Sequence, residues 1–148
     1  MDMKRKGSAV WQGGLKDGKG TVSSESGALR ETPYSFSTRF ENGAGTNPEE
    51  LIAAAHAGCF SMALSAVLGE SNLRADRIET TATASLTKTD AGFTVTAIHL
   101  DLTADVPGAG DAAFRSAAEK AKKTCPISRL LAAATITMDA RLRTGSRA

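Results

Sequence analysis

The longest apolar stretch of the chain predicts one long helix near its middle. Residues 51–68 carry no formal charge, and hydrophobic positions fall on nearly every side of a helical turn, as in a helix that other elements cover. Asn47 suits the N-cap and Pro48 the first helical position, and acidic residues follow in the first turn, where the helix dipole favours anions. We therefore expect a helix from Pro48 to about Leu68 that ends near Gly69.

Shorter runs with a period of two predict strands on both sides of this helix. The run Tyr34–Phe40 has bulky residues at its even positions, so Arg39 should point away from that aromatic face. The Thr-rich residues 77–105 should form two long strands joined by a turn at residues 90–92. The expected strands are 9–11, 20–24, 34–40, 78–86, 93–100 and 135–140, and the expected shorter helices are 111–123, capped by Asp111, and 125–133. This order indicates a single α+β domain over residues 1–148 rather than a chain of βαβ units.

Composition and charge narrow the function classes only a little. Hydrophobic residues make up 41% and charged residues 23% of the 148 residues, as in an ordinary soluble domain. A net charge of +2 gives no electrostatic reason to expect a nucleic-acid partner. The charged N-terminus lacks the apolar segment of a signal peptide, and acidic residues flank the long helix where a membrane span would carry basic anchors. We therefore expect a cytosolic protein with no membrane partner.

Two motifs resemble binding sites but lack a needed part. Residues 13–19 follow the spacing of a phosphate-binding loop, yet Gly20 stands where that loop carries Ser or Thr, and a strand follows where a helix is needed. His56 and Cys59 share a helix face, but no other pair of ligands has the spacing of a zinc site. We expect no metal and no other cofactor.

The two cysteines, Cys59 and Cys125, are the remaining candidates for chemistry. In a cytosolic protein such residues are inert core residues, a redox pair or two unrelated residues. Cys59 lies in the middle of the long helix, where the helix dipole gives little help, so it needs a nearby cation to ionise. Cys125 directly precedes Pro126 at a helix start, where backbone N–H groups can lower a thiol pKa. These local features leave both interpretations open.

The neighbours of both cysteines resemble those of one known family. The stretch Thr46–Phe60, in which Asn-Pro-Glu precedes the cysteine, resembles the active-site helix of the OsmC/Ohr family of organic hydroperoxide reductases. Residues 121–128, Ala-Lys-Lys-Thr-Cys-Pro-Ile-Ser, resemble the segment of that family that carries its resolving cysteine. The resemblance extends from about Arg5 to Leu142, and the early segments are more similar to the OsmC branch than to the Ohr branch.

The resemblance implies a fold, a reaction and four functional residues. The fold is an intertwined homodimer in which antiparallel sheets enclose two long central helices. The reaction is the reduction of organic hydroperoxides, and less efficiently of hydrogen peroxide, to alcohols without a cofactor. Cys59 would be the peroxidatic thiol, Cys125 the resolving thiol, Arg39 the activating cation and Glu49 the acid that orients the arginine. The implied reductant is an external dithiol, which in some members is a lipoyl-bearing protein.

The spacing of Glu49 and Cys59 has a geometric consequence. Ten residues on a continuous helix span ~15 Å, a distance that a Glu or Arg side chain does not bridge. We therefore expect the Glu49 that serves each Cys59 to come from the partner subunit. Apolar neighbours of Cys59, namely Phe60, Met62 and Leu64, should favour organic hydroperoxides over hydrogen peroxide.

Two other functions fit the same residues. A non-catalytic binding or stress protein would be a dimer with inert cysteines, and a Cys–His hydrolase would use Cys59 with His56. The hydrolase lacks a third residue at a sensible position to orient the histidine, and hydrolysis has no use for Cys125. The peroxidase is therefore the leading hypothesis.

Overall fold

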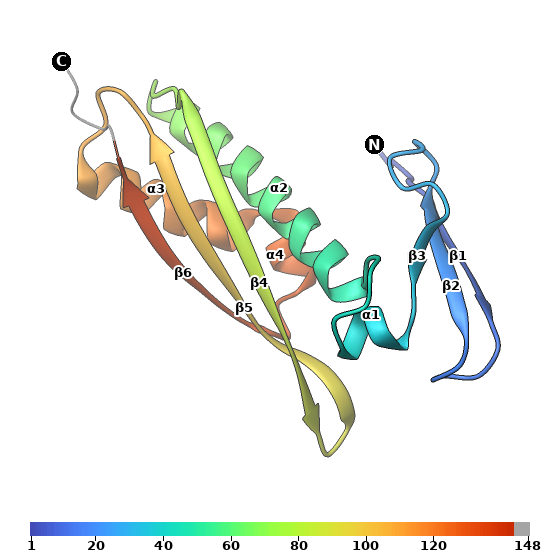
Figure 1. The fold of residues 1–148 in the computed structure, drawn as a ribbon. Coiled ribbons are helices and arrows are strands. Elements are labelled where there is room, and N and C mark those ends of the chain that lie inside the picture. The colour runs from blue at the N-terminus through green and yellow to red at the C-terminus, as the bar shows by residue number, and fades with distance from the viewer. Residues whose placement is uncertain (144–148) are drawn as a thin grey trace. The chain divides into compact units, whose positions relative to one another are not determined.

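The computed structural model describes residues 1–143 and divides into two compact units, Met1–Leu51 and Ile52 onward, which are described separately. The first unit begins with three strands, β1 (Gly7–Gln12), β2 (Lys19–Ser24) and β3 (Thr32–Tyr34), which form an antiparallel sheet in that order (Figure 1). The first two strands were predicted, and each is one to three residues longer than its hydrophobic pattern indicates.

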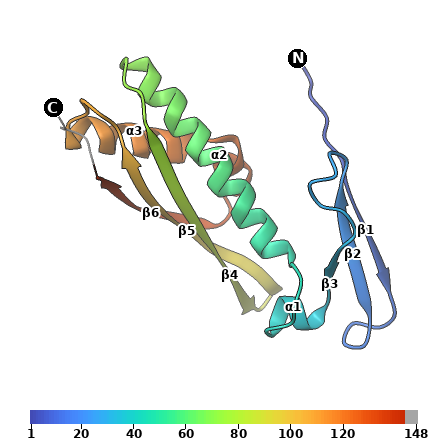
Figure 2. The same cartoon turned by 45° about the horizontal axis from the view of Figure 1, so that its top comes forward.

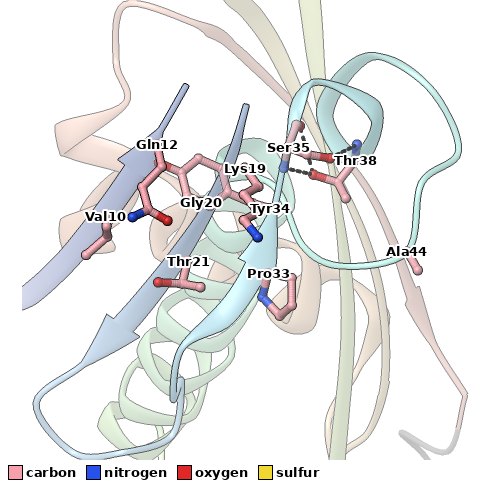
Figure 3. A pocket seen from close by; sticks show the side chains of 10 residues that line it. All are labelled: Val10, Gln12, Lys19, Gly20, Thr21, Pro33, Tyr34, Ser35, Thr38 and Ala44. Carbon is pink, nitrogen blue, oxygen red and sulfur yellow. Dashed lines mark hydrogen bonds between the residues drawn. The ribbon is translucent and has the colours of Figure 1, made fainter. Parts of the chain in front are cut away.

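A short helix, α1 (Phe36–Phe40), replaces the strand expected over residues 34–40, so that prediction is wrong. Ser35 is its N-cap: the Thr38 N–H donates to Ser35 Oγ at 3.3 Å, and the Ser35 N–H donates to Thr38 Oγ1 at 2.7 Å (Figure 3). This capping box gives hydrogen-bond acceptors to two backbone N–H groups, which would lack these partners if the segment were a strand. Phe36 and Phe40 also fit a helix, because residues four apart share a face, and their ring centroids lie 4.9 Å apart.

The second unit contains the rest of a long helix and a three-stranded sheet with two further helices. The helix α2 (Pro48–Glu70) begins as predicted, since the Glu50 N–H donates to Asn47 Oδ1 at 2.8 Å. It ends at Glu70, two residues beyond the expected end. The remaining elements are β4 (Arg77–Thr89), β5 (Gly92–Asp105), α3 (Asp111–Thr124), α4 (Pro126–Leu130) and β6 (Thr135–Leu142).

The sheet of the second unit is mixed. β4 pairs antiparallel with β5, as predicted, but β6 pairs parallel with β5 (Figure 1). The expectation of purely antiparallel sheets is therefore wrong for β6. The physical reason is the connection: α3 and α4 carry the chain back along the sheet between β5 and β6, and parallel neighbours need such a crossover.

Two smaller expectations about the short helices also need correction. The N-cap of α3 is Gly110, whereas Asp111 lies in the first turn and accepts a hydrogen bond from Arg115 Nε at 2.8 Å. The helix that follows Cys125 ends at Leu130 instead of residue 133. Both differences shift a boundary and leave the element in place.

The core of the second unit lies on one face of its sheet. Alternate residues of β5 are buried there among apolar side chains of α2 and α3, and these two helices lie along that face of the sheet (Figure 2). The principal buried residues are Ile98, Leu100 and Leu102 of β5, Phe60, Leu64 and Leu68 of α2, and Phe114, Ala118 and Ala121 of α3. Cys125 belongs to this cluster, and Cys59 packs against it.

One side of α2 is exposed within the chain, contrary to the expectation of a helix covered all round. Of the 18 consecutive residues that form its most apolar part, only 22% are buried, and Met62 is 78% exposed. The helix is long and apolar enough to cross a membrane, but a core helix of a soluble protein has the same length and composition. A single such helix is therefore weak evidence for a membrane span.

Candidate active site

The structure brings the two predicted cysteines together. Cys59 lies in the middle of α2, and Cys125 is the N-cap residue of α4. The Cys125 thiol donates a hydrogen bond to Cys59 Sγ, with a distance of 2.9 Å between the sulfur atoms. Both thiols are free, Cys125 is fully buried and Cys59 is half-buried. The two side chains are thus positioned to form a disulfide with little movement.

The surroundings of Cys59 oppose its ionisation. Burial raises the pKa of the Cys59 thiol, and the neighbouring Cys125 raises it further. A backbone hydrogen bond with Ile127, near the start of α4, acts in the opposite direction. Because the thiolate is the nucleophile, these surroundings make an additional positive charge necessary for chemistry near neutral pH.

A second buried contact joins α2 to α4. His56 Nε2 and Ser128 Oγ are 2.7 Å apart, and the two residues are 0% and 4% exposed. Burial lowers the pKa of His56, so the ring is neutral near pH 7. Its Nδ1 has no hydrogen-bond partner among the described residues, which leaves no third group to orient the ring as a hydrolase would require. Sequence reasoning singled out His56 but missed Ser128.

The remaining two predicted residues, Arg39 and Glu49, form an ion pair within the first unit. Arg39 Nε and Nη2 both donate to Glu49 Oε1, at 3.1 and 2.8 Å. The Arg39 side chain is 39% exposed and that of Glu49 only 11%. The guanidinium also lies 5.4 Å from the ring centroid of Phe40, so the expectation that Arg39 points away from the aromatic residues is wrong. The arginine is held by one carboxylate oxygen and remains accessible.

A small aromatic hollow adjoins Arg39. Its volume is about 210 Å³, and it is lined by Trp11, Leu15, Tyr34, Ser35, Phe36, Arg39 and Phe40. A neighbouring hollow of about 330 Å³ shares Tyr34 and Ser35 with it but not the arginine (Figure 3). The first hollow therefore combines an apolar lining with a fixed positive charge.

The apolar residues expected around Cys59 lie in different environments. Phe60 and Leu64 are fully buried in the core, whereas Met62 is exposed. Residues 60, 62 and 64 alternate, but α2 is a helix, so they point in different directions. They do not form one apolar surface beside Cys59.

A group of polar side chains that sequence reasoning missed lies on the open face of the second sheet. His99 and Asp101 on β5 and Asp139 on β6 place potential metal-ligating atoms within 4.8 Å of one another. His99 Nε2 lies 3.1 Å from Asp139 Oδ2, and its Nδ1 lies 2.6 Å from Thr137 Oγ1. The parallel pairing of β5 with β6 creates this cluster, and that pairing was not predicted.

Comparison with known proteins identifies the family. The model of the family described as "OsmC-like protein" matches residues 41–140, which include both cysteines and Glu49. The chain belongs to this family. The OsmC-like chain is 53% identical to the peroxiredoxin OsmC of Escherichia coli K12 over 143 residues, which are 97% of this chain and 99% of that protein.

Solved structures confirm the OsmC-like fold. An OsmC-like protein from Mycoplasma pneumoniae superposes with a TM-score of 0.75 at 17% identity, covering 96% of this chain and 99% of that one. The organic hydroperoxide resistance protein OhrB of Bacillus subtilis superposes with a TM-score of 0.66 at 25% identity, covering 93% and 98%. The α+β fold expected from the sequence is therefore correct.

Proposed function

We propose that this protein reduces organic hydroperoxides to alcohols, with Cys59 as the peroxidatic thiol and Cys125 as the resolving thiol. The observation that carries the proposal is the 2.9 Å contact between two free thiols in an apolar environment. The Escherichia coli relative is named a peroxiredoxin and the Bacillus subtilis relative an organic hydroperoxide resistance protein. These names support the same chemistry here.

The reaction takes place in three steps. The Cys59 thiol ionises, its thiolate attacks the terminal oxygen of the hydroperoxide, and the O–O bond breaks; the leaving alkoxide takes up the proton that the thiol released and departs as an alcohol. Cys59 is then a sulfenic acid. The Cys125 sulfur displaces its hydroxyl, which leaves as water, and the Cys59–Cys125 disulfide forms. An external dithiol reduces that disulfide by thiol–disulfide exchange and restores both thiols.

Arg39 supplies the positive charge that the Cys59 thiolate needs. An arginine stays charged at all relevant pH values and has several donors, so it can stabilise the thiolate and bind a peroxide oxygen. Glu49 holds its guanidinium through two hydrogen bonds to one oxygen. The aromatic hollow beside Arg39 suits the organic part of the substrate, which supports organic hydroperoxides as the preferred class.

The assembly we propose is a soluble, cytosolic homodimer in which Arg39 and Glu49 of one copy serve Cys59 of the other. Glu49 lies in the first turn of α2 and Cys59 ten residues further along the same continuous helix, a rise of ~15 Å. The exposed side of α2, which includes Met62, provides an apolar surface for the second copy.

Replacing Cys125 with Ser tests the proposed function. In the absence of reductant, one equivalent of cumene hydroperoxide should remove two titratable thiols from the wild type but only one from Cys125→Ser. The variant should then carry a sulfenic acid at Cys59 that dimedone traps, because no second thiol displaces the hydroxyl. Thiol titration and mass spectrometry measure both quantities. A variant that consumes no peroxide, or forms no dimedone adduct, would contradict the assigned roles.

Met62→Lys tests the dimer. A charge placed on the exposed side of α2 should weaken association, because a buried unpaired lysine is costly. We expect a larger fraction of monomer by light scattering and a parallel loss of peroxidase activity, since each site needs the other copy. Met3→Lys adds the same charge at another exposed methionine and should leave both properties unchanged. A fully active Met62→Lys monomer would exclude the shared site.

A further inference from the structure

The buried hydrogen bond between His56 and Ser128 lies one helical turn from the cysteine pair. His56 precedes Cys59 by three residues on α2, and Ser128 follows Cys125 by three residues. The two contacts have similar lengths, 2.7 Å between His56 Nε2 and Ser128 Oγ and 2.9 Å between the two sulfur atoms. None of the steps of the peroxidase reaction uses His56 or Ser128 chemically.

Together, the two contacts determine how α4 lies against α2. Residues three apart on a helix share a face and are separated by ~4.5 Å along the axis. On α2, His56 precedes Cys59, whereas at the start of α4, Ser128 follows Cys125. The two segments therefore run in opposite directions where these contacts join them. A single contact between the sulfur atoms would leave α4 free to rotate about it, whereas a second contact one turn away removes that freedom.

The local structure of α4 makes this second contact important. The helix has only five residues, and its N-cap residue, Cys125, makes no side-chain capping hydrogen bond. Leu130, at its other end, is 75% exposed and adds little burial. Such a short helix is not stable by itself, so its position depends on packing by Ile127 and on the polar contact at Ser128.

We propose that His56 and Ser128 are positioning residues for the resolving step, an inference that rests on the proposed function. Their hydrogen bond keeps Cys125 Sγ beside Cys59 Sγ while Cys59 is oxidised. In that step the S–O bond of the Cys59 sulfenic acid breaks, the Sγ–Sγ bond forms, and the proton of Cys125 leaves with the hydroxyl as water. Rapid resolution prevents a second hydroperoxide from oxidising Cys59 to the sulfinic acid.

The first test measures positioning without any peroxide. In a glutathione redox buffer, the equilibrium between the dithiol and the Cys59–Cys125 disulfide reports the effective concentration of one thiol at the other. We expect Ser128→Ala to lower this effective concentration about tenfold, since a buried hydrogen bond is lost and His56 keeps no partner. Ser61→Ala is the matched control: its hydroxyl also joins α2 to another element, at 2.8 Å from Thr80 Oγ1 on β4. It should leave the disulfide equilibrium unchanged.

Variants of His56 separate a specific contact from a general loss of stability. His56→Leu should reproduce the effect of Ser128→Ala, and the double variant should be no worse than either single variant, because both remove one interaction. His56→Gln, which keeps a donor near the position of Nε2, should recover part of the effective concentration. Thermal unfolding of each variant shows whether the fold is retained. Additive effects of the two substitutions would overturn the proposal.

The second test uses the reaction itself. With a tenfold excess of cumene hydroperoxide, Ser128→Ala should form the Cys59 sulfenic acid at the wild-type rate, form the disulfide about tenfold more slowly, and accumulate sulfinic acid at Cys59. An unchanged ratio of disulfide to sulfinic acid in folded Ser128→Ala would overturn the proposal. If the wild type forms the disulfide in glutathione buffer but does not react with the hydroperoxide, the proposed function fails while the positioning role stands.

Discussion

Cys59→Ser should abolish hydroperoxide reduction and leave the fold unchanged. A serine hydroxyl is nearly the same size as the thiol but does not ionise near neutral pH, so no nucleophile remains to attack the O–O bond. We expect the loss to span several orders of magnitude, down to the background reaction of hydroperoxide with the reductant. Cys59 is only half-buried, and the substitution should therefore cost little stability.

The assay is the consumption of cumene hydroperoxide in the presence of a small dithiol, with circular dichroism and thermal unfolding as checks on the fold. Cys125→Ser is the matched control, since it makes the same chemical change at the neighbouring thiol and should still consume the first equivalent of hydroperoxide. Residual multiple turnover by Cys59→Ser would show that the reaction takes place elsewhere. Unchanged cellular function of this variant would favour a non-catalytic role.

Arg39→Met should slow the reaction of Cys59 with hydroperoxide and move its pH dependence upward. Burial and Cys125 already raise the pKa of Cys59, and removing a cation disfavours the thiolate further. A charge at close range shifts a pKa by roughly 1 to 3 units, so the rate at pH 7 should fall roughly 10- to 1,000-fold. The rate still increases with pH, because only the thiolate reacts.

Stopped-flow measurement of the first oxidation step over a range of pH separates this effect from a loss of stability. At high pH the variant should recover much of the wild-type rate, whereas a misfolded protein would not. Glu49→Gln should give a smaller loss, because the cation remains although the residue that orients it is no longer charged. Arg115→Met removes an exposed arginine that pairs with Asp111 on α3 and is the matched control. An Arg39→Met profile that matches the wild type would exclude Arg39 as the activating cation.

Elements with strong local determinants were predicted from the sequence. The start of α2 was predicted because Asn47 and Pro48 act on their immediate neighbours. The strand expected over residues 34–40 was wrong because alternate aromatic residues fit both periods, and the Ser35–Thr38 capping box decides in favour of the helix. A local pattern therefore predicts an element only when it fits the period of a helix or the period of a strand, and not both.

Non-local pairings were not accessible from the sequence. The parallel alignment of β6 with β5 depends on the path of α3 and α4, and the cluster of His99 with Asp139 follows from that alignment. Ser128 is 72 residues from His56, and neither side chain indicates the other as its partner. Cys59 and Cys125 were paired only through the family resemblance, and the structure then placed their sulfur atoms together. The roles of Arg39 and Glu49 stay predictions.

The pairing of Cys59 with Cys125 during peroxide reduction is best tested by peptide mapping of the wild-type protein, after titration with less than one equivalent of cumene hydroperoxide under non-reducing conditions. We expect each molecule of cumyl alcohol formed to be matched by one intrachain disulfide between Cys59 and Cys125. Alcohol formation with both thiols still free, or with disulfides only between chains, would show that these two residues are not the redox pair.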